Sequence, residues 1–136
     1  MTLNVLIADD SELTLERMVT EISALPFVSG VWLAKDVGTA LEGIKQHKPD
    51  VVILDIKMPG GSGLDVLEEV KSWADSPIVI INTFYPYPQH KQRALALGAD
   101  YFFDKTQDFY ETINTVRELE KKLLLRDKER DGIEKI

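Results

Sequence analysis

Short apolar runs alternate along the chain with amphipathic segments, and polar or turn-forming residues follow each run. A short, unbroken apolar run is typical of a strand that is buried on both faces of a parallel sheet. Apolar residues at the helical period predict a helix after each run. The predicted strands span residues 3–8, 28–34, 51–54, 78–81 and 101–103. The pattern therefore predicts an α/β fold, in which five strands alternate with five helices and form a parallel sheet covered on both faces.

Local signals mark the ends of the predicted helices. Asp10 or Ser11 is the expected N-cap of the first helix, because either side chain can accept a hydrogen bond from a free backbone N–H. Asp36 is the expected cap of the second helix. Gly98 suits the left-handed backbone conformation that ends the fourth helix, which we expect at residues 88–97.

Length and composition limit the class of protein. At 136 residues we expect one domain over residues 1–125, followed by a charged, frayed helical tail over residues 126–136. Without cysteine there is no disulfide, thiolate metal site or cysteine nucleophile. A net charge of -7, with 16 Lys and Arg residues dispersed along the chain, argues against nucleic-acid binding. No apolar run is long enough to cross a membrane and the N-terminus lacks a signal-peptide pattern, so we expect a cytoplasmic protein without membrane contact.

Charged and polar residues gather where the predicted strands end. Asp9 and Asp10 follow the first strand, Asp55 the third, Thr83 the fourth and Lys105 the fifth. The carboxyl ends of parallel strands share one edge of the sheet, where open α/β folds bind their ligands. Crowded carboxylates repel one another, and the Lys105 ammonium together with a divalent cation would offset this repulsion. Oxygen ligands with room for water suit Mg²⁺ better than Zn²⁺ or Ca²⁺, so the sequence predicts a magnesium site.

Each of these residues also has a simpler interpretation. Taken alone, Asp10 is a helix cap, Lys105 a solvated loop charge and Thr83 a strand-end hydroxyl bonded to the backbone. Asp55 can be a nucleophile, a metal ligand or a structural cap. Their occurrence together at one edge favours the metal site over the separate interpretations.

The order of these motifs resembles the response-regulator receiver domain of two-component signalling. The resemblance rests on Asp9-Asp10 after the first strand, Asp55 followed by Met58-Pro59-Gly60, Thr83, and Gly98-Ala99 ahead of Lys105. It covers nearly the whole chain, from residue 3 to about residue 125. It implies a flavodoxin-like three-layer α/β/α sandwich with a sheet of order 2-1-3-4-5.

The resemblance also implies a role for each matching residue. Asp55 would accept a phosphoryl group from a histidine kinase, a phosphotransfer protein or a small donor such as acetyl phosphate. Asp10, Asp55 and the backbone carbonyl of Lys57 would hold Mg²⁺, and Asp9 would contribute through water. Lys105 would pair with the incoming phosphate. Such a transfer needs little beyond alignment and charge neutralisation, and an ionised carboxylate needs no general base.

A switch is implied as well. The Thr83 hydroxyl would bond a phosphoryl oxygen, and Phe102, three residues before Lys105, would swing inward. The rearranged surface would comprise the fourth helix, fifth strand and fifth helix, and would meet a downstream target that the sequence does not identify.

The chain departs from the family pattern at the edge of the predicted site. Thr106 follows Lys105 where the family usually has proline. The peptide bond between them, and with it the direction of the ammonium group, is therefore not constrained as it is in the family. Phe84 follows Thr83 where a small residue is usual. We predict that Phe84 screens the site from small donors and from water; the alternative is that its ring simply packs under the loop.

Three functional classes remain open. The first is a stand-alone, phosphorylatable receiver that is not an enzyme and signals by contact with another protein. The second is a pseudo-receiver, which would bind partners without being phosphorylated. The third is a phosphatase of the haloacid dehalogenase type, which usually has a second acid two residues after its nucleophile. Lys57 occupies that position here and argues against the third class.

Overall fold

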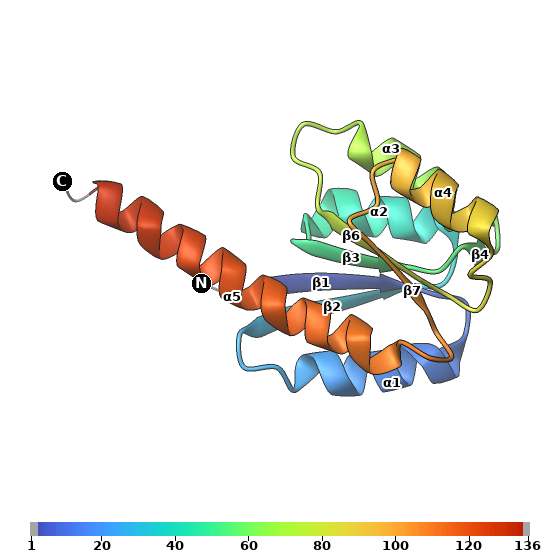
Figure 1. Ribbon diagram of the computed structural model, residues 1–136, viewed down its shortest axis with the longest axis horizontal. Coiled ribbons are helices and arrows are strands. Elements are labelled where there is room, and N and C mark those ends of the chain that lie inside the picture. Colours follow the sequence, from blue (N-terminus) through green and yellow to red (C-terminus); the bar gives the residue numbers. More distant parts are fainter. Residues whose placement is uncertain (1–2, 135–136) are drawn as a thin grey trace.

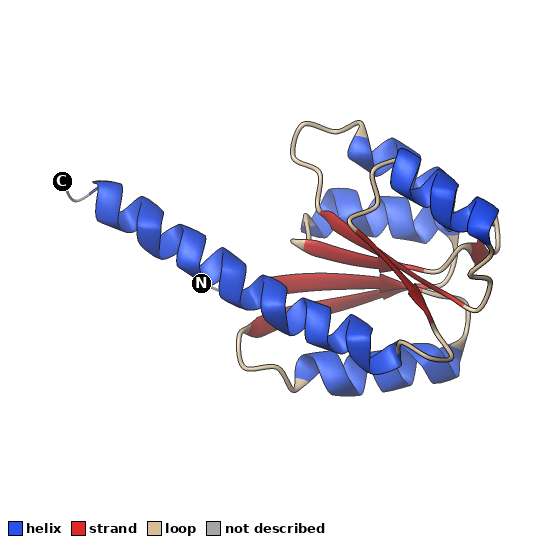
Figure 2. Cartoon of the chain, viewed as in Figure 1, coloured by secondary structure: helices blue, strands red, loops and turns tan. Residues whose placement is uncertain are grey.

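The computed structural model describes residues 3–134, except for the side chains of residues 124 and 126–134. Helices and strands alternate along most of the chain (Figures 1 and 2). In chain order they are β1 (Leu3–Ala8), α1 (Glu12–Ser23), β2 (Val28–Ala34), α2 (Val37–His47), β3 (Val51–Leu54), β4 (Lys57–Met58), β5 (Gly61–Ser62), α3 (Gly63–Lys71), β6 (Ile78–Thr83), α4 (Pro88–Ala96), β7 (Tyr101–Asp104) and α5 (Phe109–Glu134). Every predicted strand and helix is present.

The five long strands form one parallel sheet in the order β2-β1-β3-β6-β7. Since β6 and β7 are the fourth and fifth long strands, this is the expected order 2-1-3-4-5. Helices α1 and α5 cover one face of the sheet, and α2, α3 and α4 cover the other (Figure 1). The predicted flavodoxin-like three-layer architecture is therefore confirmed.

The central strand β3 shows why an unbroken apolar run forms this sheet. Val51 and Ile53 pack with apolar residues of α1 and α5, whereas Val52 and Leu54 pack with those of α2, α3 and α4. Because both faces are buried, every position of β3 is apolar. The chain leaves the core directly after Leu54, which places Asp55 at the carboxyl edge of the sheet.

The structure distinguishes between the two expected caps of α1. Ser11 is the N-cap and its hydroxyl accepts from a backbone N–H of the first turn at 3.3 Å, so Asp10 is not the cap. Asp36 caps α2 as predicted, accepting from the Thr39 N–H at 2.7 Å. Gly98 follows the end of α4 with a φ of 101°, the left-handed conformation expected of it.

Some elements extend further than the apolar pattern predicted. Strand β6 includes Thr83 and β7 includes Asp104. The segment after Asp55, expected to be only a turn, contains the short antiparallel pair β4–β5. Gly60 and Gly61 link the pair with positive φ angles of 87° and 143°, which side chains with a Cβ rarely adopt.

Helix α5 projects beyond the sheet (Figure 1). Among the side chains that the structure describes, its buried residues lie between Phe109 and Glu120, and Leu125 is 59% exposed. The backbone is helical to Glu134, through the segment expected to fray, and the fraying itself stays a prediction. Residues 135 and 136 lie outside the described residues. Within residues 3–134, no helix combines the length and apolar character that a bilayer crossing requires.

Candidate functional site

The residues that directly follow β1, β3 and β7 still form backbone hydrogen bonds with a neighbouring strand. These bonds hold the backbone of the acidic site in place. The backbone N–H of Asp9 donates to the Ala34 carbonyl at 3.0 Å, and that of Asp55 donates to the Ala8 carbonyl at 3.0 Å. The Lys105 N–H donates to the Thr83 carbonyl at 2.8 Å. The side chains therefore leave a rigid sheet edge and not a mobile loop, as a preorganised site requires.

The predicted carboxylates do converge. Asp9, Asp10 and Asp55 each offer a carboxylate oxygen, and these oxygens lie within 4.8 Å of one another. Asp9 and Asp55 are buried, whereas Asp10 is exposed at the rim. One Oδ of Asp9 also accepts from the Ser11 N–H at 2.9 Å, which orients that carboxylate at the start of α1.

Lys105 lies between two of these acids. Its Nζ is 3.0 Å from Oδ2 of Asp55 and also forms an ion pair with Oδ2 of Asp9. All three side chains are almost fully buried. Burial raises the pKa of Asp9, and the hydrogen bond from Lys105 opposes that rise. The peptide bond between Lys105 and Thr106 is trans. The ammonium group nevertheless reaches both acids, although threonine and not the family's usual proline follows the lysine.

The two oxygens of the Asp55 carboxylate have different surroundings. Its Oδ2 is held by Lys105, but its Oδ1 is buried and has no hydrogen-bond partner among the described residues. A buried oxygen without a partner is costly, so a ligand there would stabilise the site. Three carboxylates and one ammonium leave a local excess of negative charge. This set of hard oxygen donors fits Mg²⁺.

Gly63 is a site residue that the apolar and charge patterns did not reveal. A Cβ at this position would lie 1.9 Å from the backbone oxygen of Asp55, and the Gly63 N–H donates to the Ile56 carbonyl at 2.7 Å. The start of α3 therefore touches the backbone that carries Asp55. The available signal was a glycine directly after Ser62, the helix cap.

Thr83 lies at the end of β6, and Phe102 lies on the neighbouring strand β7. Thr83 is fully buried at the end of β6, and its hydroxyl accepts from the Tyr85 N–H at 3.0 Å. Phe102 lies on β7, is partly buried and packs against the core beneath α2, α3 and α4. The Thr83 carbonyl accepts from the Lys105 N–H, and Phe102 is paired in the sheet with Ile81 of β6. A switching role for them stays a prediction.

The aromatic ring of Phe84 contacts the ammonium group of Lys105. The Lys105 Nζ lies 4.7 Å from the centre of the Phe84 ring, which is 51% exposed. The side chain of Lys57 makes a similar contact, with its Nζ 4.4 Å from the centre of the Tyr85 ring. The ring of Phe84 therefore lies against Lys105, and its role as a screen stays a prediction.

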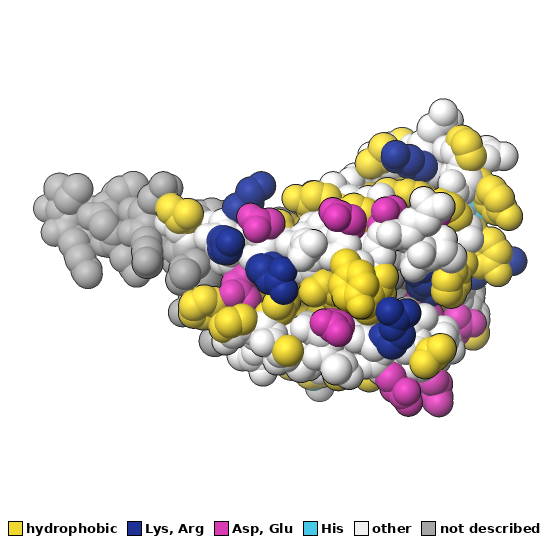
Figure 3. Space-filling view, turned by 60° about the horizontal axis from the view of Figure 1, so that its bottom comes forward, with side chains coloured by type: hydrophobic (Ala, Val, Ile, Leu, Met, Phe, Trp, Pro, Cys, Tyr) yellow, Lys and Arg dark blue, Asp and Glu magenta, His cyan; other side chains and the backbone are white. Residues whose placement is uncertain are grey.

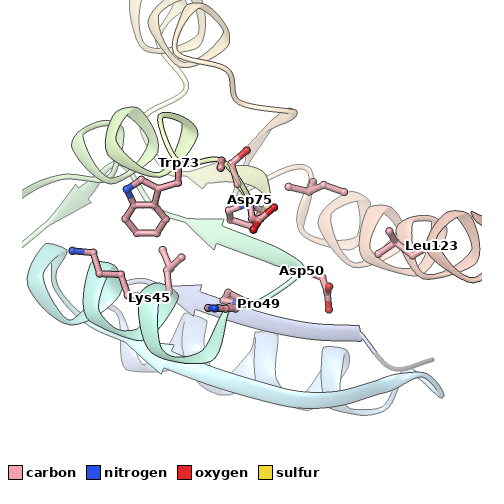
Figure 4. Close-up of a pocket in the computed structure, with 12 residues that line it drawn as sticks. Lys45, Pro49, Asp50, Trp73, Asp75 and Leu123 are labelled. Atoms are coloured by element: carbon pink, nitrogen blue, oxygen red, sulfur yellow. The ribbon is translucent and has the colours of Figure 1, made fainter. Parts of the chain in front are cut away.

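A cavity of about 580 Å³ lies elsewhere, at the amino ends of β3 and β6 (Figure 4). Trp73 and Lys45 line it, and the Lys45 Nζ lies 5.7 Å from the centre of the Trp73 ring. Asp9, Asp10, Asp55 and Lys105 do not line it. On the face shown in Figure 3, basic side chains are interspersed with acidic ones and form no continuous patch among the described residues.

Comparisons with known proteins agree with this geometry. The family model of the response regulator receiver domain matches residues 5–117. A protein-glutamate methylesterase/protein-glutamine glutaminase from Methylobacillus flagellatus is 39% identical over 106 residues, which cover 77% of this chain and 30% of that protein. The chain thus spans about a third of the length of the curated relatives it matches.

Solved structures show the same fold. The response regulator domain of Thermotoga maritima CheB superposes with a TM-score of 0.78 at 26% identity, covering 90% of this chain and 96% of that one. A DNA-binding response regulator of the LuxR family from Staphylococcus aureus gives a TM-score of 0.79 at 28% identity, covering 85% and 97%.

Proposed function

Since the chain belongs to the response regulator receiver domain family, we propose that Asp55 is its phosphoryl acceptor and that Mg²⁺ is its cofactor. The donor would be a histidine kinase or a phosphotransfer protein, with acetyl phosphate as a small substitute. The observation that carries this proposal is the state of the Asp55 carboxylate. Lys105 holds one oxygen while the other is buried without a partner, at the meeting point of three acids.

The transfer follows from the positions of these groups. An Asp55 oxygen attacks the phosphorus atom and forms a new phosphorus–oxygen bond, while the bond to the donor's imidazole nitrogen or acetate oxygen breaks. The electron pair of the broken bond leaves with the imidazole or acetate. Asp55 needs no general base because a carboxylate is ionised at neutral pH. Lys105 is near enough to Asp55 to pair with the incoming phosphoryl oxygens.

Mg²⁺ would lie among Asp10, Asp55 and the Lys57 backbone carbonyl, with Asp9 contributing through water, and would neutralise charge between acceptor and donor. The donor set supports this assignment because it consists of oxygens only and keeps one of them free. The exposed position of Asp10 at the rim leaves room for water and for a phosphate oxygen.

We propose that the signal leaves through Thr83 and Phe102. A phosphoryl group brings roughly two negative charges and three acceptor oxygens. The Thr83 hydroxyl, which accepts from the Tyr85 N–H, would donate its own proton to a phosphoryl oxygen and so couple the phosphoryl group to the loop after β6. Phe102 would then move, and the surface of α4, β7 and α5 would change shape for a downstream protein.

The role proposed for this domain is regulatory and not that of an enzyme with a released product. The curated relatives are named as methylesterases and glutaminases, and this chain matches about a third of their length. A pseudo-receiver role is the alternative that the experiment below must exclude.

The test is the intact mass of the full chain after incubation with Mg²⁺ and acetyl phosphate. One stable added phosphoryl group that is absent in Asp55→Asn supports the proposal. Continuous release of phosphate without accumulation would point instead to a phosphatase. No added mass, followed by no transfer from a phosphorylated histidine kinase or phosphotransfer protein, would overturn the proposal in favour of a pseudo-receiver. Labelling that persists in Asp55→Asn would show that another residue is the acceptor.

A further inference from the structure

The loop between β7 and α5 has no proline after Lys105, yet the lysine is well placed. A lysine side chain is long and flexible, so its ammonium group is well aimed only when the backbone that carries it is held firmly. On one side, the Lys105 N–H is bonded to the Thr83 carbonyl. On the other side the chain continues through Thr106, which does not restrict its own φ as proline would.

Two carboxylates close this loop from within. Oδ1 of Asp104 accepts from the N–H of Thr106 at 2.9 Å and from its hydroxyl at 2.6 Å. Oδ2 of Asp108 accepts from the Asp104 N–H at 3.1 Å, and the Asp108 N–H donates to the Asp104 carbonyl at 2.8 Å. Residues 104 to 108 therefore form a turn whose two ends are bonded to each other, with Lys105 inside it.

The direction of the Asp108 side chain is informative. Asp108 directly precedes the first residue of α5, where an acceptor side chain ordinarily caps the helix. Its Oδ2 instead reaches back to the residue before Lys105. The turn is also attached to the body of the protein, because the Thr112 hydroxyl contacts both the Asp108 carbonyl, at 3.3 Å, and the buried amide oxygen of Asn82, at 3.4 Å. The polar side chains around Lys105 are thus bonded to its own backbone segment.

We propose that Asp104, Thr106 and Asp108 are positioning residues that hold Lys105 toward Asp55 in place of the missing proline. Among the described residues none of the three forms a hydrogen bond or ion pair with Asp9, Asp10 or Asp55, so they act through the lysine. This inference rests on the proposed function only as far as Lys105 serves the phosphoryl group. The placement of the lysine can be measured by itself.

The test compares two pairs of variants in the full chain. Thr106→Val removes the hydroxyl that bonds Asp104, and Thr106→Ser keeps it. Asp104→Ala removes the acceptor, and Asp104→Asn keeps a neutral acceptor oxygen. The first readout is the ¹⁵N NMR signal of the Lys105 ammonium, which burial in an ion pair protects from exchange. The second is the rate of labelling by acetyl phosphate at saturating donor, measured together with the Mg²⁺ dissociation constant.

We expect Thr106→Val and Asp104→Ala to weaken or broaden the Lys105 signal and to slow labelling severalfold, while the Mg²⁺ dissociation constant stays that of the wild type. Thr106→Ser and Asp104→Asn should restore most of both readouts. Circular dichroism shows whether each variant is folded, and Thr106→Val is a mild enough change to keep the test valid if Asp104→Ala unfolds.

Two failures are distinguishable. A wild-type Lys105 signal and wild-type labelling in Thr106→Val and Asp104→Ala would overturn the positioning role and leave the proposed function intact. If the wild type itself is not labelled, the proposed function fails, and the ammonium signal alone still decides whether the turn places the lysine. A loss of Mg²⁺ affinity equal to the loss of labelling would also overturn the inference, because it would indicate a general disturbance of the site.

Discussion

The Lys105 ammonium lies 3.0 Å from Oδ2 of Asp55 and pairs at the same time with Asp9. One buried cation thus serves two buried acids. Removing one partner of a buried pair leaves a charge that is neither solvated nor compensated, at a cost of about 3 kcal/mol or more. We therefore expect Lys105→Met to lower the free energy of unfolding by about that amount at neutral pH without Mg²⁺. Urea unfolding measures it.

The matched control is another lysine ion pair of this protein. Lys35 pairs with Glu12 on the surface, where both side chains are more than half exposed. Exposed pairs contribute little to stability, so Lys35→Met should leave the urea midpoint unchanged. If Lys105→Met were as harmless as Lys35→Met, the buried pair would not contribute to the fold as proposed here.

Gly63 tests how the backbone of Asp55 is held. The Cβ of Gly63→Ala would lie 1.9 Å from the Asp55 backbone oxygen, so the segment carrying Asp55 must move. Overpacking of this kind costs about 1–3 kcal/mol, and we expect a loss in this range together with slower labelling by acetyl phosphate. Gly38→Ala is the control, since its Cβ would meet only a side-chain oxygen at 3.6 Å on an exposed turn of α2. Gly38→Ala should stabilise slightly. Equal effects of the two variants in urea unfolding would contradict the prediction.

Much of the fold followed from the apolar pattern because the three central strands β1, β3 and β6 are buried on both faces. The run from Val51 to Leu54 has no polar residue, and the strand ends where Asp55 begins. The same logic placed Asp9 at this edge, because it directly follows β1, and Lys105 follows the shorter and only partly buried strand β7. The order of the strands came from the family resemblance, because the periodicity of a run does not say which strands are neighbours.

The remaining features depend on contacts between residues far apart in the sequence. The need for glycine at position 63 arises from a backbone that passes close to it only in the folded chain. The contact of Phe84 with Lys105 depends in the same way on how two loops meet. The choice of Ser11 over Asp10 as helix cap was open because both side chains can accept a hydrogen bond. The pair β4–β5 is too short to leave an apolar pattern.

Mg²⁺ should stabilise the protein, and Asp10 should govern how much. A ligand that binds only the folded state adds about 2.7 kcal/mol at 100 times its dissociation constant. Asp10 is exposed, so Asp10→Asn should have little effect without metal. We expect it to reduce the rise in melting temperature that Mg²⁺ produces in the wild type, because one charged ligand is lost. Thermal unfolding in EDTA and across a Mg²⁺ series measures both effects. An undiminished rise in Asp10→Asn would remove Asp10 from the metal site.

The turn around Lys105 should show a pH dependence of its own. The hydroxyl and N–H of Thr106 lower the pKa of Asp104 from its ordinary value. Because the folded pKa is lower than the unfolded one, the contribution to stability is present above the ordinary Asp pKa and is lost as the pH falls through the lowered value. Thr106→Val should raise the pKa of Asp104 toward its ordinary value, as a carboxyl NMR titration would measure. Thr20→Val removes a hydroxyl that bonds a helix carbonyl and should leave the pKa of Asp104 unchanged.

Phe84 should control access to the acidic site. Its ring lies over the Lys105 ammonium and is half exposed, so it stands between Lys105 and the solvent. We expect Phe84→Ala to admit small donors and water, which would raise both the acetyl phosphate labelling rate and the rate of phosphoryl loss severalfold. Tyr87→Ala is the control, because Tyr87 is an equally exposed aromatic residue of the same loop whose ring contacts those of Tyr85 and His90 and not Lys105. If Phe84→Ala changed neither rate, or if Tyr87→Ala changed both as strongly, Phe84 would not be the screen. A rise in labelling alone would show that the ring excludes the donor but not the water that attacks the phosphoryl group.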